Sequence, residues 1–468
     1  MKIKHFGYKR DQVRPKILHF GVGNFHRAHL ECYTNELLNT DTTADWGICG
    51  AMIMAQDETL YKKLKEQENI YSLSICGRDG KNSVQWIGSL VELYWSENDL
   101  KSIIDKVADP QISIISMTIT EGGYNLDTDA VRNDLKNPAS PQSIFGIIAE
   151  GLRHRIKNSN EPVTILSCDN LQHNGDACKK IFMSFFEQQD QELTEWAVNN
   201  ITFPNSMVDR ITPATTPADV ERINKTLDKK DECPVYCEDY LQWVVEDNFI
   251  AGRPEWEKVG VEFTDDVAPY EKMKLSLLNA SHTLLSYPSF LSGYRKVDLA
   301  MRDKKIVKFI EDFMNLDVTP YVPSPPNTDL EVYKKTLIER FANSAVSDQI
   351  SRLCGDGASK FPVYVLPILK EILKHNADTT RITYLLASYY HYLKYQSDDN
   401  NESFEIFEPC LNESDKEKLN SPNPEDFLSS TPFATIEFKN YPKFIDEYLS
   451  MVEKIKTQGA MNVLKSIV

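Results

Sequence analysis

Residues 270–282 carry side chains that could move a proton and hold an alkoxide. If this segment is an α-helix, Lys274, Asn279 and His282 fall within an arc of about 140°. Glu271 lies inside the same arc. A lysine takes a hydroxyl proton when burial or a nearby cation lowers its pKa, an asparagine amide donates to a developing oxyanion, and a histidine can orient a second hydroxyl. These residue types at this spacing favour hydride transfer from a secondary alcohol.

The other side of the same segment is apolar, which predicts a helix packed against a core. Its apolar residues recur at helical spacing and are Met273, Leu277, Ala280 and Leu284. An ordinary core-facing helix with a surface lysine and a hydrogen-bonded histidine has the same spacing. The pattern alone therefore leaves both interpretations open.

Residues 16–54 have the pattern of a β-α-β unit whose first strand ends in Gly21 and Gly23. Backbone N–H groups at such a turn, together with the N-terminus of the next helix, can hold a pyrophosphate. His26 stands where the usual dinucleotide fingerprint has its third glycine. Because paired glycines also occur in plain tight turns, this motif predicts a dinucleotide site only together with others.

The residue that accepts from the ribose hydroxyls of NAD should follow the second strand of this unit. Asp57 is the first acid there, a little later than expected, and no arginine stands beside it to bind a 2′-phosphate. The sequence therefore favours NAD and does not exclude NADP.

Two more apolar runs, 112–120 and 163–168, predict buried strands that end in polar residues. A crevice at the carboxyl ends of parallel strands would place Thr118 and Glu121 beside the cofactor. Asn170 is a candidate for contacting the reacting oxygen, although an Asx-turn or a helix N-cap would use the same residue. Another pair of candidates, Arg352 and Lys360, flanks a Gly-rich turn and could bind a polyhydroxy or carboxylate substrate or simply line a solvated helix entrance.

Composition narrows the class of protein. A chain of 468 residues can form two or three domains, and a net charge of -17 disfavours nucleic acid and anionic membranes as general partners. The first residues lack the apolar region of a signal peptide, so none is expected there, and no apolar run is long enough to span a bilayer. Nine scattered cysteines suggest reduced thiols and a cytoplasmic location. The pair Cys233 and Cys237 lacks partners at zinc spacing, so no metal site is expected.

A change of pattern near residue 265 predicts a domain boundary. Strand-like runs alternate with helices before it, which predicts an α/β domain of the Rossmann type over residues 1–265. Amphipathic helices dominate residues 266–468 and are expected at 269–285, 303–315, 329–344, 361–374, 380–394 and 442–457. Residues 397–432 are polar and contain prolines, so we expect a long exposed excursion with a short helix at 414–419.

Taken together, these stretches resemble the polyol-specific long-chain dehydrogenases, the mannitol dehydrogenase family, from about Ile17 to Pro367. The motifs that carry the resemblance are Gly21-x-Gly23-x-Phe25-His26-Arg27, Thr120-Glu121-Gly122-Gly123-Tyr124, Cys168-Asp169-Asn170, Met207-Val208-Asp209-Arg210, Gln242-Trp243-Val244 and Lys274 with Asn279 and His282. Six motifs in the right order are specific, although each alone is common.

The resemblance implies a zinc-independent, NAD-dependent enzyme that interconverts a sugar alcohol and its ketose, with mannitol and fructose as the first pair to test. It implies a nucleotide-binding first domain, a mostly helical second domain and substrate bound in a cleft between them. The expected catalytic residues are Lys274 as the general base, Asn170 and Asn279 as the oxyanion pair, and His282 as the substrate-orienting residue, with Glu271 as a proton relay. The expected cofactor-binding residues are Gly21, Gly23, Asn24, Phe25, Arg27, Asp57, Thr118 and Glu121. The expected substrate residues are Asp209, Arg352 and Lys360, and the family pattern implies a monomer or weak dimer.

Three alternatives stay open at this point. A hexuronate reductase of the same wider family, acting on fructuronate or tagaturonate, would share the catalytic helix and need more cations. A short-chain dehydrogenase is suggested by Tyr270-x-x-x-Lys274, but Tyr61/Lys65 and Tyr390/Lys394 show the same spacing. A non-catalytic NAD-binding sensor would have no need of a base beside two amides.

Overall fold

The structure, a computed structural model, describes residues 2–41 and 45–468. It divides into two compact units, Met1–Ala268 and Pro269–Val468. The first unit is α/β and the second is mostly helical, which confirms the predicted fold class.

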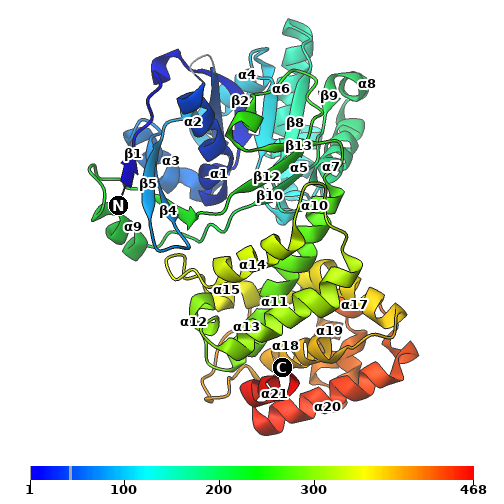
Figure 1. Ribbon diagram of the computed structural model, residues 1–468. Helices are drawn as coiled ribbons and strands as arrows, with labels where there is room; N and C mark the ends of the chain where they lie inside the picture. Colours follow the sequence, from blue (N-terminus) through cyan, green and yellow to red (C-terminus); the bar gives the residue numbers. More distant parts are fainter. Residues whose placement is uncertain (1, 42–44) are drawn as a thin grey trace. The chain divides into compact units, whose positions relative to one another are not determined.

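The first unit is built on a six-stranded sheet whose neighbouring strands are all parallel. In spatial order the strands are β6 (Leu90–Trp95), β3 (Trp46–Met52), β2 (Arg14–Phe20), β7 (Ile114–Met117), β8 (Val163–Ser167) and β9 (Ile201–Thr202). Within this sheet, β2 comes first along the chain, and β3 and β6 follow on one side of it. The chain then returns to place β7 on the other side of β2 (Figure 1). This order is that of a dinucleotide-binding Rossmann sheet, with its topological switch point between β2 and β7.

Successive residues of each central strand belong to two different cores, so both faces of the sheet are buried. In β2, Ile17 packs into one core and Leu18 into the other, and in β7 Ile114 and Ile115 divide in the same way. Strands covered on both faces must be apolar throughout, which explains why they read as continuous apolar runs in the sequence.

Two smaller sheets complete the strands of the first unit. One has the order β1 (Lys2–Lys4), β5 (Ser83–Ile87), β4 (Tyr71–Cys76) and β11 (Val235–Glu238). The other has the order β10 (Ser206–Asp209), β12 (Gln242–Glu246) and β13 (Glu262–Thr264).

Helices cover both faces of the main sheet (Figure 1). The α-helices of the first unit are α1 (Asn24–Ala28), α2 (Leu30–Thr40), α3 (Glu58–Glu66), α4 (Ser96–Ala108), α5 (Asp129–Lys136), α6 (Ile144–Asn158), α7 (Asn174–Gln189), α8 (Gln191–Asn200) and α9 (Pro217–Asn224). Side chains of α2 enter the core that contains Ile17, while those of α4, α6 and α7 enter the core that contains Leu18. The carboxyl ends of the strands are thereby left at one edge of a rigid scaffold.

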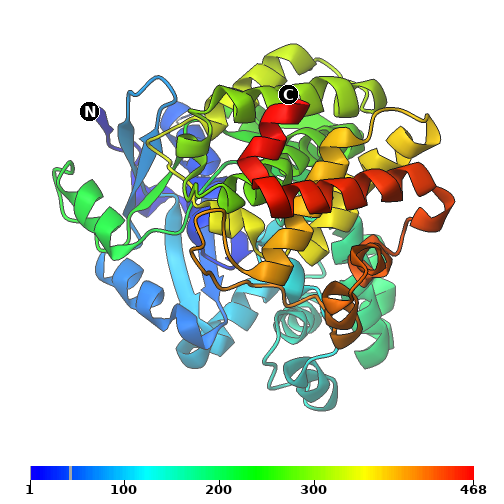
Figure 2. The same ribbon diagram turned by 90° about the horizontal axis from the view of Figure 1, so that it is seen from below.

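Among the described residues of the second unit, the regular secondary structure is helical, apart from isolated β-bridges. The helices are α10 (Ala268–Met273), α11 (Ala280–Leu291), α12 (Val297–Ala300), α13 (Lys304–Asp312), α14 (Leu330–Phe341), α15 (Ile350–Cys354), α16 (Gly357–Lys360), α17 (Leu366–Lys374), α18 (Thr380–Tyr395), α19 (Glu413–Asn420), α20 (Pro442–Gln458) and α21 (Ala460–Ile467). The last two are the orange-red and red helices of Figure 2, and α20 packs against α18.

Each long helix expected in the second unit is present, but three of them contain π-helical turns. These turns are Lys274–Asn279, Phe313–Val318 and Phe361–Val365. The short helix expected near 414–419 is α19. The expectation of a long exposed excursion over 397–432 is wrong in part, because Phe427 and Leu428 are buried and Phe427 packs against Tyr389 of α18 and against Phe433 just beyond the stretch.

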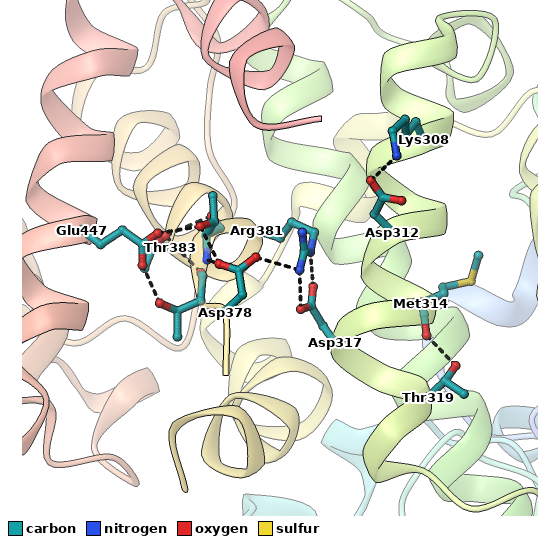
Figure 3. A network of polar contacts seen from close by, with 11 residues as sticks. Lys308, Asp312, Met314, Asp317, Thr319, Asp378, Arg381, Thr383 and Glu447 are labelled. Carbon is teal, nitrogen blue, oxygen red and sulfur yellow. Dashed lines mark hydrogen bonds and ion pairs between the residues drawn. The ribbon is translucent and has the colours of Figure 1, made fainter. Parts of the chain in front are cut away.

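A buried ion pair ties the beginning of α18 to the π-helical turn after α13 (Figure 3). The guanidinium of Arg381 donates to both carboxylate oxygens of Asp317 and also to Asp378. On the same helix, Thr380 donates its hydroxyl to Glu447 of α20 at 2.8 Å. The helices of the second unit are therefore joined by directed polar contacts as well as by apolar packing.

None of the helices in the described parts of the chain combines the length and apolar character needed to cross a membrane.

Candidate active site

The turn after β2 can accommodate only glycine at Gly21. This residue has φ +91°, and a Cβ atom there would lie 2.2 Å from the carbonyl oxygen of Thr118. At Gly23, which precedes α1, a Cβ would meet no heavy atom within 4 Å. The first glycine thus allows β2 and β7 to meet at the switch point, and the second leaves the backbone open to a ligand. Both features fit a bound pyrophosphate.

His26 explains how this turn works without a third glycine. Its ring lies flat on the ring of His19 from β2, with centroids 3.3 Å apart and planes at 8°. Both rings are buried, and burial lowers the pKa of each well below its ordinary range. Two neutral imidazoles can stack closely, so the helix approaches the strand through aromatic contact rather than through a missing side chain.

His19 also joins the two strand ends of the switch point. Its Nε2 lies 3.2 Å from the carbonyl oxygen of Gly21 and 3.1 Å from the hydroxyl of Thr118. The Thr118 hydroxyl in turn donates to the Gly21 carbonyl at 2.7 Å. The structure therefore brings Gly21, Gly23 and Thr118 together, as a nucleotide site requires.

The side chains of Asn24 and Arg27 point into the first unit. Arg27 donates to the carbonyl of Cys233 at 2.6 Å and to the side-chain oxygen of Asn24 at 2.7 Å. Phe25 stacks on His29 with centroids 4.9 Å apart. These contacts fix α1, so any contribution of Asn24, Phe25 or Arg27 to cofactor binding would come largely through the shape of the turn.

Two acidic residues predicted to face the cofactor lie after strand ends. Asp57 closes a 3₁₀ turn after β3, and one carboxylate oxygen accepts from the backbone N–H of Met54 at 3.0 Å. Glu121 is exposed in the loop that follows β7. Both positions are at the edge of the sheet that carries Gly21.

The end of β8 holds Asn170 on a fixed stretch of backbone. The side-chain amide of Asn174 donates to the carbonyl oxygens of Ser167 and Asp169, each at 3.1 Å. Asp169 directs its carboxylate to the loop after β7, a role that the sequence analysis left unassigned. The sequence held a signal for this role, because Asp169 directly follows a strand predicted to be buried, and a buried acid is expected to accept hydrogen bonds.

The second unit presents its candidate residues on one long helix, formed by α10, the π-helical turn Lys274–Asn279 and α11. Lys274 is only 6% exposed and Glu271 only 4% exposed. Asn279 is half-buried, and its side-chain oxygen has no hydrogen-bond partner among the residues that the structure describes. Oxygen and nitrogen of a side-chain amide are exchanged by a simple flip, so this end of the amide can equally present donors. The predicted core stripe, with Met273 among its members, is buried throughout.

The arc calculated for an α-helix does not hold across residues 274–279. A π-helical turn forms i→i+5 bonds and so rotates every residue beyond it relative to those before it. Lys274 stands at the beginning of this turn and Asn279 at its end. His282 follows on α11, where its ring stacks on Phe341 with centroids 4.3 Å apart.

The three candidate substrate residues lie in different settings. Asp209 is buried at the end of β10. Arg352 forms a bidentate ion pair with Asp348 one turn earlier. Lys360 donates to the main-chain carbonyls of residues 352, 353 and 355, and burial lowers the pKa of its ammonium group. A lysine has three donors, so a substrate contact by Lys360 would replace one of these bonds.

A search of residues 2–41 and 45–468 finds no group of three or more His, Cys, Asp or Glu side chains arranged to hold a metal ion.

Both units of the chain match models of the same protein family. The model for the mannitol dehydrogenase Rossmann domain matches residues 15–258, and the model for the mannitol dehydrogenase C-terminal domain matches residues 266–456. A polyol:NADP oxidoreductase of Gluconobacter oxydans is 38% identical, over 91% of this chain and 90% of the relative. A mannitol 2-dehydrogenase of Aspergillus clavatus is 34% identical, over 98% of this chain and 94% of the relative.

Solved structures agree with these matches. The ternary complex of Pseudomonas fluorescens mannitol 2-dehydrogenase with NAD and D-mannitol superposes with a TM-score of 0.89 at 37% identity, covering 100% of this chain and 96% of that one. A substrate-free D-sorbitol dehydrogenase superposes with a TM-score of 0.91 at 33% identity, covering 99% and 97%.

Proposed function

Because the chain belongs to the mannitol dehydrogenase family, we propose that it is an NAD-dependent polyol dehydrogenase that interconverts a sugar alcohol and its ketose. The observation that supports this most directly is the joint occurrence of a switch point suited to a dinucleotide and a helix that carries a buried lysine and a buried glutamate three residues apart. Mannitol and fructose are the first pair to test, since relatives named for mannitol align with nearly the whole chain.

In the proposed oxidation, Lys274 accepts the proton of the substrate hydroxyl. When bound, the nicotinamide accepts the hydride from the same carbinol carbon. Asn170 and Asn279 donate to the oxygen while it is alkoxide-like, where a fixed donor lowers the barrier most. His282 orients a neighbouring hydroxyl of the substrate. Reduction of the ketose runs through the same groups in reverse, with Lys274 as the acid.

Glu271 is proposed to pass the proton between Lys274 and solvent. It precedes Lys274 by three residues on the same helix, a spacing that places two side chains on one face. Both side chains are buried, so bulk water has little access to the Lys274 ammonium. In the proposal the Glu271 carboxylate takes up the proton in place of bulk water. Asp209, Arg352 and Lys360 are proposed to contact the polyol, and a metal ion has no part in this scheme.

A substrate and cofactor panel tests the overall proposal. Mannitol, sorbitol, fructose, fructuronate and tagaturonate should be assayed with NAD(H) and NADP(H), because one relative is named for NADP. We expect the highest kcat/KM for a polyol and ketose pair with NAD(H). Selective turnover of the two hexuronates would instead identify the hexuronate reductase alternative, and absence of turnover with every pair would contradict the proposal.

Lys274→Ala tests the assignment of the base. Turnover should fall by about 10²- to 10⁴-fold, the usual contribution of a general base, while affinity for NADH measured by fluorescence stays within about twofold. Lys272→Ala is the matched control, because Lys272 is an exposed lysine on the same helix. Equal activity in the Lys274 variant and this control would remove Lys274 from the mechanism.

Asn170→Ala and Asn279→Ala should each lower turnover by roughly 10²-fold.

A further inference from the structure

Asp169, the residue before Asn170, connects two strand ends at the candidate nucleotide site. Its carboxylate accepts from the backbone N–H of Ile119 at 3.1 Å, the backbone N–H of Thr120 at 2.8 Å and the hydroxyl of Tyr124 at 2.8 Å. The residue itself is only 6% exposed. A buried carboxylate just after β8 therefore holds the 118–124 loop that follows β7.

The loop adopts a conformation that it would not keep unaided. Thr120 has φ +61° and ψ +170°, which is a strained region for a β-branched residue. Thr120 and Glu121 are exposed, so apolar packing of their side chains does not hold this conformation in place. The hydrogen bonds to Asp169 act directly on the strained segment, and they are the contacts best placed to stabilise it.

The backbone of Asp169 is fixed from its own side as well. Its N–H donates to the hydroxyl of Ser167 at 3.3 Å, and its carbonyl accepts from the amide of Asn174 at 3.1 Å. The Ser167 hydroxyl also lies 2.6 Å from that of Tyr124. Asp169 is thus clamped between β8 and α7, which makes it a rigid support for the loop.

We propose that Asp169 is a positioning residue that holds the 118–124 loop in the conformation that binds the nicotinamide cofactor. The inference rests on the proposed NAD-dependent function, since the cofactor is what the loop would contact beside Gly21 and Thr118. The loop begins at Thr118, whose hydroxyl bonds the Gly21 carbonyl at the switch point. A displacement of the loop would therefore alter the nucleotide site directly.

The ionisation state of Asp169 gives this role a pH signature. Burial raises the pKa of its carboxyl to about 6, and the Glu121 carboxylate acts in the same direction, whereas the bonds from Ile119, Thr120 and Tyr124 lower it. The other titratable groups nearby are the Tyr124 hydroxyl and the thiols of Cys168 and Cys178, and burial raises the pKa of each, so they remain neutral. As the pH falls through about 6, the carboxyl gains a hydrogen where N–H donors point, and the loop loses support.

The test compares Asp169→Asn with Asp134→Asn, which alters a buried aspartate of similar chemistry. The Asp134 carboxylate accepts from the N–H of Gln142 at 2.7 Å and from the N–H and hydroxyl of Ser143 at 2.8 and 2.6 Å. It supports the start of α6 and makes none of its hydrogen bonds to the 118–124 loop. Two measurements are made on each full-length protein, the Kd for NADH by fluorescence titration and amide hydrogen exchange across the loop.

Asp169→Asn should raise the Kd for NADH about tenfold or more and speed exchange of the Ile119 and Thr120 amides, as expected for weakened bonds to a charged acceptor. Asp134→Asn should lower the melting temperature and leave the Kd within about twofold. Tyr124→Phe, a milder change that removes one bond to Asp169, should raise the Kd by a smaller factor. Between pH 7.5 and 5 the Kd of the wild type should rise more steeply than that of Asp169→Asn.

Unchanged exchange of the two loop amides in Asp169→Asn would overturn the positioning role whether or not the protein binds NADH. An equal rise of the Kd in Asp134→Asn would overturn it too, because general loss of stability would then explain the effect. If the wild type binds neither NADH nor NADPH, the proposed function fails together with the cofactor part of this inference. Faster exchange in the variant would then still show that Asp169 holds the loop.

Discussion

Asp57 is the residue on which the choice between NAD and NADP is expected to depend. One of its carboxylate oxygens accepts from the N–H of Met54, which fixes the side chain at the end of the turn after β3. The remaining oxygen is the group proposed to accept from a ribose hydroxyl. A carboxylate there would also repel the 2′-phosphate of NADP, so one residue can both attract one cofactor and reject the other.

Asp57→Ala is therefore expected to change cofactor selectivity. We expect KM for NAD to rise about tenfold, the scale of one hydrogen bond to a charged group, with little change or a decrease in KM for NADP. The measurement is the ratio of kcat/KM for NAD to that for NADP with one polyol substrate. Glu58→Ala provides the control, since Glu58 is the adjacent exposed acid and pairs with Lys62. A ratio that moves equally in both variants would exclude Asp57 as the determinant.

At the scale of elements, Arg155 joins the end of α4 to the segments that lead into β7 and β8. Its side chain on α6 uses all five guanidinium N–H groups, one to each of the carbonyl oxygens of Val107, Asp109, Ile112, Glu161 and Pro162. These carbonyls lie at the end of α4 and in the segments that lead into β7 and β8. Arg155 is fully buried, so water cannot replace the bonds.

Arg155→Met should lower the free energy of unfolding of the first unit by at least about 3 kcal/mol, because several buried carbonyls lose their donors. Arg155→Lys should recover only part of this loss, since an ammonium has three donors and no planar fork. All six tryptophans lie between residues 46 and 256, so tryptophan fluorescence during urea unfolding reports on the first unit.

Arg132→Met is the matched control for these variants. Arg132 lies at the surface and pairs with Asp127 and Asp129, so its loss should leave the urea midpoint nearly unchanged. If Arg155→Met and Arg132→Met were equally stable, the five buried bonds would contribute little.

Elements whose residues share one pattern could be predicted from the sequence, and irregular ones could not. The strands that end near Gly21, Thr118 and Asn170 read as apolar runs because both of their faces are buried, and the structure places them as predicted. The π-helical turn at Lys274–Asn279 left no signature, because its residues follow the same apolar periodicity as an α-helix.

Long-range pairings were equally hidden. His26 appeared only as a missing glycine, since its stacking partner His19 lies in the preceding strand and nothing in the spacing marks the contact. The burial of Phe427 in the polar, proline-containing stretch 397–432 depends on its contact with Tyr389 of α18. Asp169 accepts hydrogen bonds from residues far earlier in the chain, 50 positions earlier for Ile119 and 49 for Thr120. Sequence patterns describe local structure, and these features are tertiary.

At the scale of the whole molecule, the proposed chemistry draws on residues of both units. Asn170 belongs to the first, and Lys274 and Asn279 belong to the second. The net charge of -17 favours neutral polyols over polyanions as substrates, because an acidic chain repels polyanions. A buried ionisable group whose pKa differs between the folded and unfolded states makes the stability of the protein depend on pH.

Glu31 is the buried carboxyl with the clearest effect of this kind. It is fully buried on α2, accepts from the hydroxyl of Tyr71 at 2.9 Å and lies 2.9 Å from Nε2 of His26. Burial raises the pKa of its carboxyl to about 7 from an ordinary value of 4.5. Between these two values the folded protein keeps a proton that the unfolded chain releases. The contribution of Glu31 to the free energy of unfolding therefore falls as the pH rises through this window.

Glu31→Gln removes the titration and keeps an acceptor for Tyr71. The free energy of unfolding of the variant minus that of the wild type should rise by on the order of 2 kcal/mol between pH 4.5 and 7 and level off above it. His19 and His26 are present in both proteins, and burial keeps both rings neutral, so the difference isolates Glu31. Tryptophan fluorescence in urea at a series of pH values measures it. Glu66→Gln, at an exposed position on α3, should show a flat difference from the wild type. A flat profile for Glu31→Gln as well would mean that Glu31 is ionised in the folded protein over the same range as in the unfolded chain.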